Sequence, residues 1–161
     1  MKKKLLAGGF GLMEVAVAAA IISVALFALI GALQKTLAVA DLSVKNIQAA
    51  FLLEEGMEAL RSLRDGGWSA KIAPLSTSTS YYFYFNAAGW QATTTNIYVD
   101  GVFERSFSLA DVFRDANDNI AVSGAADPDT RKIMVSVSWK TKTGATTTRG
   151  ASTYLTNLFE I

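Results

Sequence analysis

The sequence lacks two residue types that carry much of protein chemistry. None of its 161 residues is a cysteine or a histidine. Without cysteine there are no disulfide bonds and no thiolate metal sites. Without histidine, the commonest general base and the commonest zinc ligand are missing. Catalysis would have to depend on serine, threonine, lysine, aspartate or glutamate, and we therefore predict that the protein is not an enzyme and needs no cofactor.

An excess of charge is also missing. The chain has 15 basic and 14 acidic residues, which gives a net charge of +1. Removing the lysines at positions 2, 3 and 4 leaves 12 basic residues (15 minus 3) against 14 acidic ones, a net charge of −2. Domains that bind nucleic acid usually display a basic face. We predict no nucleic-acid partner.

One long apolar run lies near the start of the chain, and no second run is long enough to cross a membrane. The stretch "FGLMEVAVAAAIISVALFALIGAL" covers residues 10–33. A helix of about 24 residues is roughly 36 Å long. That length exceeds the thickness of the hydrocarbon core of a membrane, roughly 30 Å. The run shows no polar face, which disfavours a core helix of a soluble protein. We predict a single membrane-spanning helix in contact with lipid.

The charges beside this run predict its orientation. Lys2, Lys3 and Lys4 precede it, and only Lys35 follows closely. Basic residues stay on the cytoplasmic side of a membrane. We expect the N-terminus in the cytoplasm, the helix in the cytoplasmic membrane and everything after Leu33 outside.

Glu14 is the residue that the apolar run does not explain. A secretory signal peptide cut after "VAVAAA" and an uncleaved signal-anchor both account for the basic and apolar parts. Neither accounts for a carboxylate, which costs about 2.5–3.5 kcal/mol deep in a membrane helix and less near the interface. An ionisable residue in such a place indicates a function and a partner.

The stretch "KKKLLAGGFGLMEV" resembles the leader and N-terminus of type IV pilins and type II secretion pseudopilins. In that family a short basic leader ends in glycine, the next residue is usually phenylalanine, and glutamate is fifth after the cut. Gly9, Phe10 and Glu14 occupy those positions here. Gly11 and Met13 depart from the usual residues. The resemblance implies a leader of residues 1–9, cleavage between Gly9 and Phe10 by a prepilin peptidase, and N-methylation of Phe10.

The resemblance also implies how subunits assemble. Cleavage creates an α-amino group on Phe10 with a reference pKa of about 7.7–8.0, and Glu14 of a neighbouring subunit would meet it. The implied partners are other pilins or pseudopilins in a helical filament and an inner-membrane assembly platform with its ATPase. The subunit would end in a cell-surface pilus or a pseudopilus. The sequence leaves open which machine it serves, and the alternative is a membrane-anchored surface binding protein that never polymerises.

The helix is predicted to continue beyond the membrane, from Phe10 to Asp65, and to end at Gly66-Gly67. Its second half, residues 34–66, is amphipathic and expected to be half buried in a globular head. The predicted apolar stripe consists of Leu37, Ala40, Val44, Ile47 and Phe51, spaced by three and four. It continues more loosely, to about Arg64, through Leu52, Met57, Leu60 and Leu63. The charged residues Glu54, Glu55, Glu58, Arg61, Arg64 and Asp65 are interpreted as a solvated face, with a subunit contact as the alternative.

The head, residues 67–161, is rich in threonine, serine, tyrosine, phenylalanine and valine, which favour strands. We predict strands at "YYFYF" and "KIMVSVSWK", a two-residue hairpin turn at Asp100-Gly101, a turn at Gly144 and a closing strand at "STYLTNLF". "KIAPLSTSTS" is expected to be a loop, and "RDANDN" and "AADPDTR" are expected to be turns. The fold class is α+β, a long helix packed on an antiparallel sheet, which is the pilin fold. "ALRSLRDGGW", "VSVSW" and "TYLTNLF" look like those of minor pilins or minor pseudopilins.

Two further groups of residues have a functional and an ordinary interpretation. Oxygen ligands for calcium could come from Asp115, Asn117, Asp118 and Asn119, with Asp127 and Asp129, but the spacing of a twelve-residue calcium loop is absent and these residues also form turns. A stacking platform for DNA or sugar could come from Tyr81, Tyr82, Phe83, Tyr84, Phe85 and Trp90, although sheet core with a subunit contact is favoured.

Overall fold

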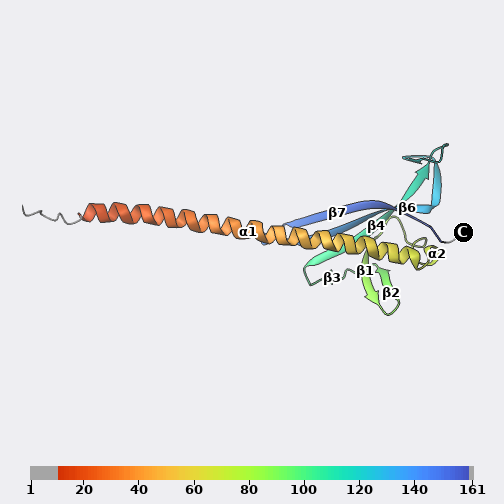
Figure 1. The fold of residues 1–161 in the computed structure, drawn as a ribbon, viewed down its shortest axis with the longest axis horizontal. Helices are drawn as coiled ribbons and strands as arrows, with labels where there is room; N and C mark the ends of the chain where they lie inside the picture. Colours follow the sequence, from red (N-terminus) through yellow and green to blue (C-terminus); the bar gives the residue numbers. More distant parts are fainter. Residues whose placement is uncertain (1–10, 160–161) are drawn as a thin grey trace, which may run out of the picture. The chain divides into compact units, whose positions relative to one another are not determined.

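The computed structural model describes residues 11–159 and has the predicted α+β architecture. The chain divides into two compact units, one through Ser43 and one from Val44 onward. The longest element, α1, runs through both (Figure 1). In chain order the elements are α1 (Leu12–Asp65), α2 (Trp68–Lys71), β1 (Ser80–Asn86), β2 (Gly89–Thr93), β3 (Tyr98–Val99), β4 (Phe103–Arg114), β5 (Ile120–Ala121), β6 (Ala125–Lys140) and β7 (Thr146–Thr156).

The first unit consists, among the described residues, of α1 as far as Ser43, and its apolar side chains are exposed. Its most apolar window has a mean hydropathy of 2.7, and no residue of that window is buried. By length and composition this helix can cross a membrane. Its hydroxyl groups need no outside partner, because those of Ser23, Thr36 and Ser43 donate to carbonyl groups one turn back, at 2.8–3.0 Å.

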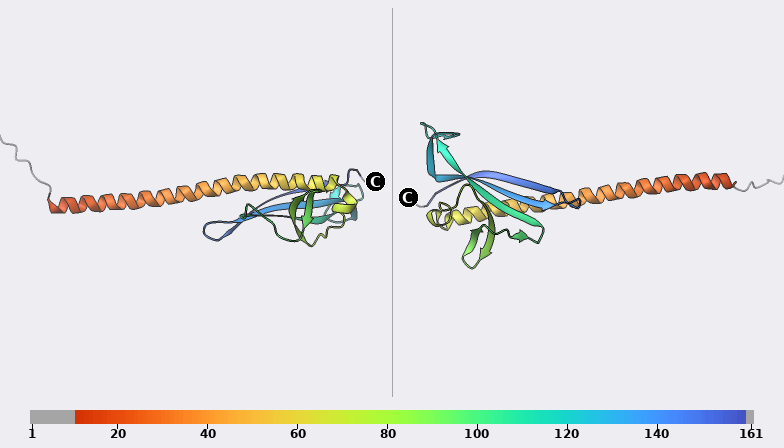
Figure 2. Two further views of the ribbon diagram at one scale, coloured as in Figure 1. Left: turned by 90° about the horizontal axis from the view of Figure 1, so that it is seen from below. Right: turned by 180° about the vertical axis from the view of Figure 1, so that it is seen from behind.

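The second unit is an antiparallel sheet with helix on one face. The strand order is β2-β1-β4-β6-β7, and the short strands β3 and β5 each pair with β4. The part of α1 that belongs to this unit runs along the sheet (Figure 2). Alternation decides which side chains meet it: Ile133, Val135, Val137 and Trp139 of β6 are all at most 2% exposed. The predicted half-buried strand "KIMVSVSWK" is confirmed.

The predicted stripe of α1 is exposed in its first part and buried in its last part. Val44, Ile47 and Phe51 are 56%, 58% and 66% exposed, and Leu37 in the first unit is 66% exposed. The buried helix residues are Ala49, Gly56, Ala59, Leu60 and Leu63. Leu60 and Leu63 belong to the looser continuation of the stripe and are confirmed, whereas the alanines and the glycine were not predicted to be buried.

Gly56 marks the closest approach. A Cβ atom added there would lie 2.9 Å from Cγ1 of Val135 and 3.6 Å from Cδ of Arg105. Arg105, on β4, is only 5% exposed. Its guanidinium donates to Glu55 at 2.5 Å and lies over the rings of Phe83 and Trp90, with the guanidinium carbon 5.2 and 5.3 Å from the ring centroids. One carboxylate of the charged face of α1, that of Glu55, therefore pairs with a buried residue of the head. The charged face is not wholly solvated.

Four other charged residues of that helix face pair within the helix. Arg61 forms an ion pair with Glu58. Asp65 accepts from Arg64 at 2.7 Å rather than from Arg61.

The hairpin at Asp100-Gly101 is confirmed, with one difference. Both residues have positive φ, 52° and 67°, as a type I′ turn requires, and the Val102 N–H donates to the Val99 carbonyl at 3.0 Å. Regular pairing resumes at Val99–Phe103, so the loop holds three residues rather than two.

One local prediction about the head is wrong, and two elements, α2 and β2, were not predicted. "AADPDTR" is not a turn but part of β6, where a bulge separates the pairs Asp111–Arg131 and Val112–Asp127. A bulge tolerates Pro128, which has no N–H to donate. The segment before the predicted loop forms α2, and Ile72 is fully buried. The strand β2 was not predicted, because the five residues of "GWQAT" alternate too briefly.

Candidate functional sites

Glu14 lies in the first turn of α1 and caps that helix. Its Oε2 accepts a hydrogen bond from the Gly11 N–H at 3.1 Å, and the Glu14 N–H donates to the Gly11 carbonyl at 3.0 Å. A glutamate three residues after the cap residue typically reaches back in this way. Within residues 11–159 the carboxylate therefore has one partner, the Gly11 N–H. The surrounding large side chains are exposed, with Met13 at 81% and Val17 at 55%.

The other residues of the predicted processing signal lie outside the described residues. These are Lys2, Lys3, Lys4, Gly9 and Phe10. Cleavage, methylation and orientation remain predictions.

The second unit exposes an apolar strip along α1. Val44, Ile47 and Phe51 are spaced by three and four and lie on one helix face, at 56–66% exposure. Phe51 also borders a hollow of about 380 Å³ with Leu52 and Phe103. Exposed apolar side chains that gather in one place indicate an interaction surface.

The candidate calcium ligands are engaged in their own turn and with an arginine. Asp115 Oδ1 accepts from the N–H groups of Asn117 and Asn119 at 2.8 and 2.9 Å. These hydrogen bonds lower the pKa of the Asp115 carboxyl, and the bond from the Asn119 N–H has the largest effect. Arg114 donates to Asp127 at 2.6 Å and lies 3.6 Å from Asp118. Among residues 11–159, no group of three or more acidic side chains is placed to hold a metal ion.

Burial and hydrogen bonding shift the pKa of the Asp127 carboxyl in opposite directions. Burial alone would raise the pKa of its carboxyl, but hydrogen bonds from Arg114, Thr130 and the Asp129 N–H outweigh burial and hold that pKa below its usual value. The carboxylate is the form that this cluster stabilises, as in an ordinary structural ion pair.

The aromatic residues of β1 are divided between core and surface. Phe83 is 4% exposed and packs on Phe107 with ring centroids 4.7 Å apart. Tyr81 stacks on the same ring at 5.5 Å. Only Phe85, at 68% exposure, is largely open. Phe83 therefore belongs to the sheet core, whereas Tyr81, Tyr82 and Tyr84 are partly exposed, and the rings do not form one open stacking platform.

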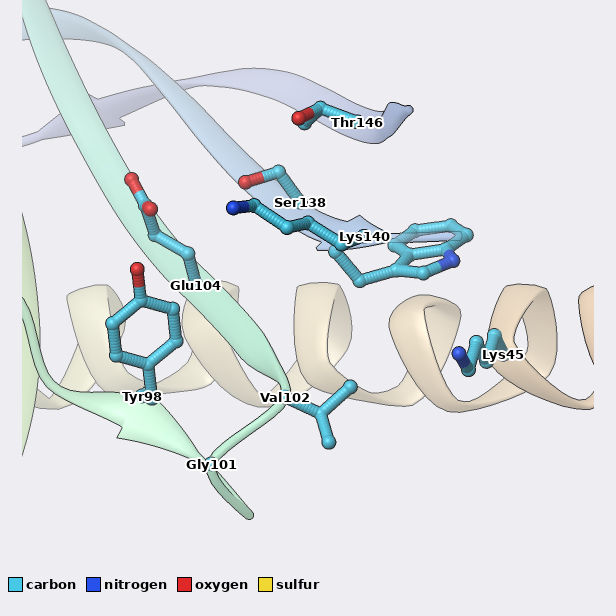
Figure 3. A pocket seen from close by; sticks show the side chains of 9 residues that line it. Lys45, Tyr98, Gly101, Val102, Glu104, Ser138, Lys140 and Thr146 are labelled. Atoms are coloured by element: carbon cyan, nitrogen blue, oxygen red, sulfur yellow. The ribbon is translucent and has the colours of Figure 1, made fainter. Parts of the chain in front are cut away.

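A polar hollow in the second unit was not predicted from the sequence. It has a volume of about 430 Å³ and is lined by side chains from α1, β3, β4, β6 and β7. In Figure 3 the Tyr98 hydroxyl and the Glu104 carboxylate point in the same direction, and the Lys140 ammonium points toward Ser138 and Glu104. Pairing explains this convergence, because Glu104 is opposite both Tyr98 and Ser138.

The carboxylate of Glu104 accepts a hydrogen bond beside this hollow. The Tyr82 hydroxyl donates to its Oε1 at 3.4 Å, and burial together with this carboxylate raises the pKa of Tyr82. Alternation along β4 and β6 could have placed Glu104, Ser138 and Lys140 on the outer face. Only the register between the strands brings them together.

No protein-family model, curated protein or solved structure matches this chain.

Proposed function

We propose that the protein is a non-enzymatic, pilin-like subunit that is held in the cytoplasmic membrane by α1 and then assembled into a filament. The observation that carries the proposal is a single carboxylate, Glu14, at the start of an apolar helix whose side chains are exposed. The α+β architecture supports it. The proposed partners are a prepilin peptidase, other pilins or pseudopilins and an inner-membrane assembly platform.

The proposed role of Glu14 is to neutralise the new N-terminus of a neighbouring subunit. Two opposite charges that are each costly in lipid become tolerable when they pair across a helix interface. Before cleavage there is no ammonium group at Phe10, so the pair cannot form. Cleavage would thereby permit assembly.

Capping of α1 is the alternative role for Glu14, and two substitutions separate the roles. Glu14→Gln keeps a side chain that can cap the Gly11 N–H but removes the charge, and Glu14→Ala removes both. If the charge matters, both variants fail to enter filaments. We expect incorporation to fall by about a hundredfold or more, since losing one partner of a buried ion pair costs about 3–5 kcal/mol. The measurement is the amount of subunit in sheared filaments relative to membranes.

Ser23→Ala is the matched control. It removes a polar group from the same apolar segment, but the Ser23 hydroxyl is already bonded to the Ala19 carbonyl within the helix. We expect normal incorporation. Normal incorporation of Glu14→Gln would show that capping suffices and would refute the charge-pairing role.

The mature N-terminus tests the proposal as a whole. Mass spectrometry of the purified protein should find a chain that begins with methylated Phe10. An intact Met1 would instead favour a membrane-anchored surface binding protein that does not polymerise.

A further inference from the structure

We propose that the polar hollow between β3, β4, β6 and β7 is a binding site for one sugar residue of a glycan. The site lies wholly within the unit from Val44 onward and does not depend on filament assembly. Its volume of about 430 Å³ falls within the roughly 300–1,000 Å³ of small-ligand sites.

The charges of the hollow select the class of ligand. Glu104 disfavours a simple anion, and Lys45 and Lys140 disfavour a simple cation. A sugar hydroxyl can donate to the carboxylate and accept from the ammonium, so one type of group satisfies both. A polyhydroxylated, uncharged ligand fits this mixed lining best.

Several of these groups lack a hydrogen-bond partner within the described part of the chain. The hydroxyls of Tyr98 and Ser138 and the ammonium of Lys140 make no side-chain hydrogen bond with residues 11–159. Trp139 also lines the hollow, but it is 2% exposed and its indole N–H is fully buried. The groups available to a ligand are therefore the Tyr98 and Ser138 hydroxyls and the Lys140 ammonium.

The ring of Tyr98 provides the apolar part of the site. It is 56% exposed, on the two-residue strand β3 beside Glu104, and it is oriented with its hydroxyl along the carboxylate (Figure 3). A sugar ring presents hydroxyls at its edge and C–H groups on its face. An exposed aromatic ring next to a carboxylate and an ammonium matches both surfaces.

The test uses the full chain in a detergent with a zwitterionic, sugar-free head group. Saturation-transfer NMR with N-acetylglucosamine, galactose and mannose should show saturable transfer to at least one sugar, and none to the zwitterion L-alanine. Tyr98→Ala should weaken binding by about tenfold. Lys140→Ala should weaken it by roughly threefold to tenfold.

Tyr154→Ala is the matched control, because Tyr154 is a similarly exposed tyrosine, at 46%, on β7 and outside the hollow. It should leave binding unchanged. If Tyr98→Ala fails to fold, Tyr98→Phe keeps the ring and tests the hydroxyl alone, with a smaller loss expected. Absence of saturable transfer from every sugar, equal weakening by Tyr154→Ala, or binding of L-alanine in place of sugar would each overturn the proposal.

Discussion

The stretch of α1 before Val44 and the unit from Val44 onward place their apolar side chains in opposite environments. In the first, Leu12 and Phe27 are 91% and 76% exposed. In the second, Leu60 and Val135 are fully buried. One continuous helix therefore contributes apolar surface to the outside in its first part and to an internal core in its last part.

This difference teaches where the stability of each part comes from. The second unit is stabilised by its own core of helix and sheet side chains. Among residues 11–43 no residue belongs to such a core, and exposed apolar surface of this kind is typical of a helix that contacts lipid or other helices. The same type of substitution should therefore change stability differently in the two parts.

Leucine-to-alanine substitutions should show the largest contrast. Leu60→Ala should lower the free energy of unfolding by about 2–5 kcal/mol, because it opens a cavity in the core. Leu29→Ala, at a position 56% exposed in the same helix, should change it little. Urea denaturation followed by tryptophan fluorescence measures this, since Trp68, Trp90 and Trp139 all belong to the second unit. Equal losses would mean that the two parts unfold as one.

Glycine-to-alanine substitutions should reverse sign between the two parts. A Cβ atom added at Gly31 would contact nothing within 4 Å, so Gly31→Ala should stabilise the helix by up to about 1 kcal/mol. Gly56→Ala puts a Cβ 2.9 Å from Val135, and overpacking of about 1–3 kcal/mol should exceed the helix gain. Helicity by circular dichroism reports the first effect, and the urea midpoint reports the second. A stabilising Gly56→Ala would show that the sheet can move away from α1.

Acid should weaken the second unit by a smaller amount. The pKa values of Asp115 and Asp127 are lowered in the folded state, so these carboxylates stabilise it above their unfolded pKa of about 3.9. That contribution is lost as the pH falls through the lower folded values. The urea midpoint should therefore decrease on acidification below about pH 4. Asp127→Asn should cost about 1 kcal/mol at pH 6 and flatten the decrease, whereas an unchanged pH profile would contradict the role of Asp127.

The elements with strong local signals were predictable from sequence. The long apolar run predicted the start of α1, the pair Gly66-Gly67 predicted its end, and alternation in "KIMVSVSWK" predicted the buried face of β6. Asp100-Gly101 predicted a hairpin because few residues other than glycine, asparagine and aspartate adopt positive φ. Each of these signals is carried by neighbouring residues.

The helix face that meets the sheet was not predictable in the same way. Hydrophobic periodicity predicted the buried Leu60 and Leu63, but it also favoured the exposed Val44, Ile47 and Phe51. It gave no signal for Ala49, Gly56 and Ala59, which are buried. Small side chains carry a weak hydrophobic signal, although they permit the shortest distance between a helix and a sheet. The burial of Arg105 depends on the same contact, since its partner Glu55 lies on α1, 50 positions away in sequence.

Residue type and local spacing are enough to predict the long helix, its apolar first part, the isolated carboxylate at Glu14 and the strand-rich composition that follows. Three features become visible only in the folded chain: the small residues of α1 that are buried, the pairing of the bulged strand β6, and the hollow lined by Tyr98, Glu104, Ser138 and Lys140. Those features depend on strand register and on close contacts between segments that are distant in sequence. Neither can be predicted from local sequence patterns.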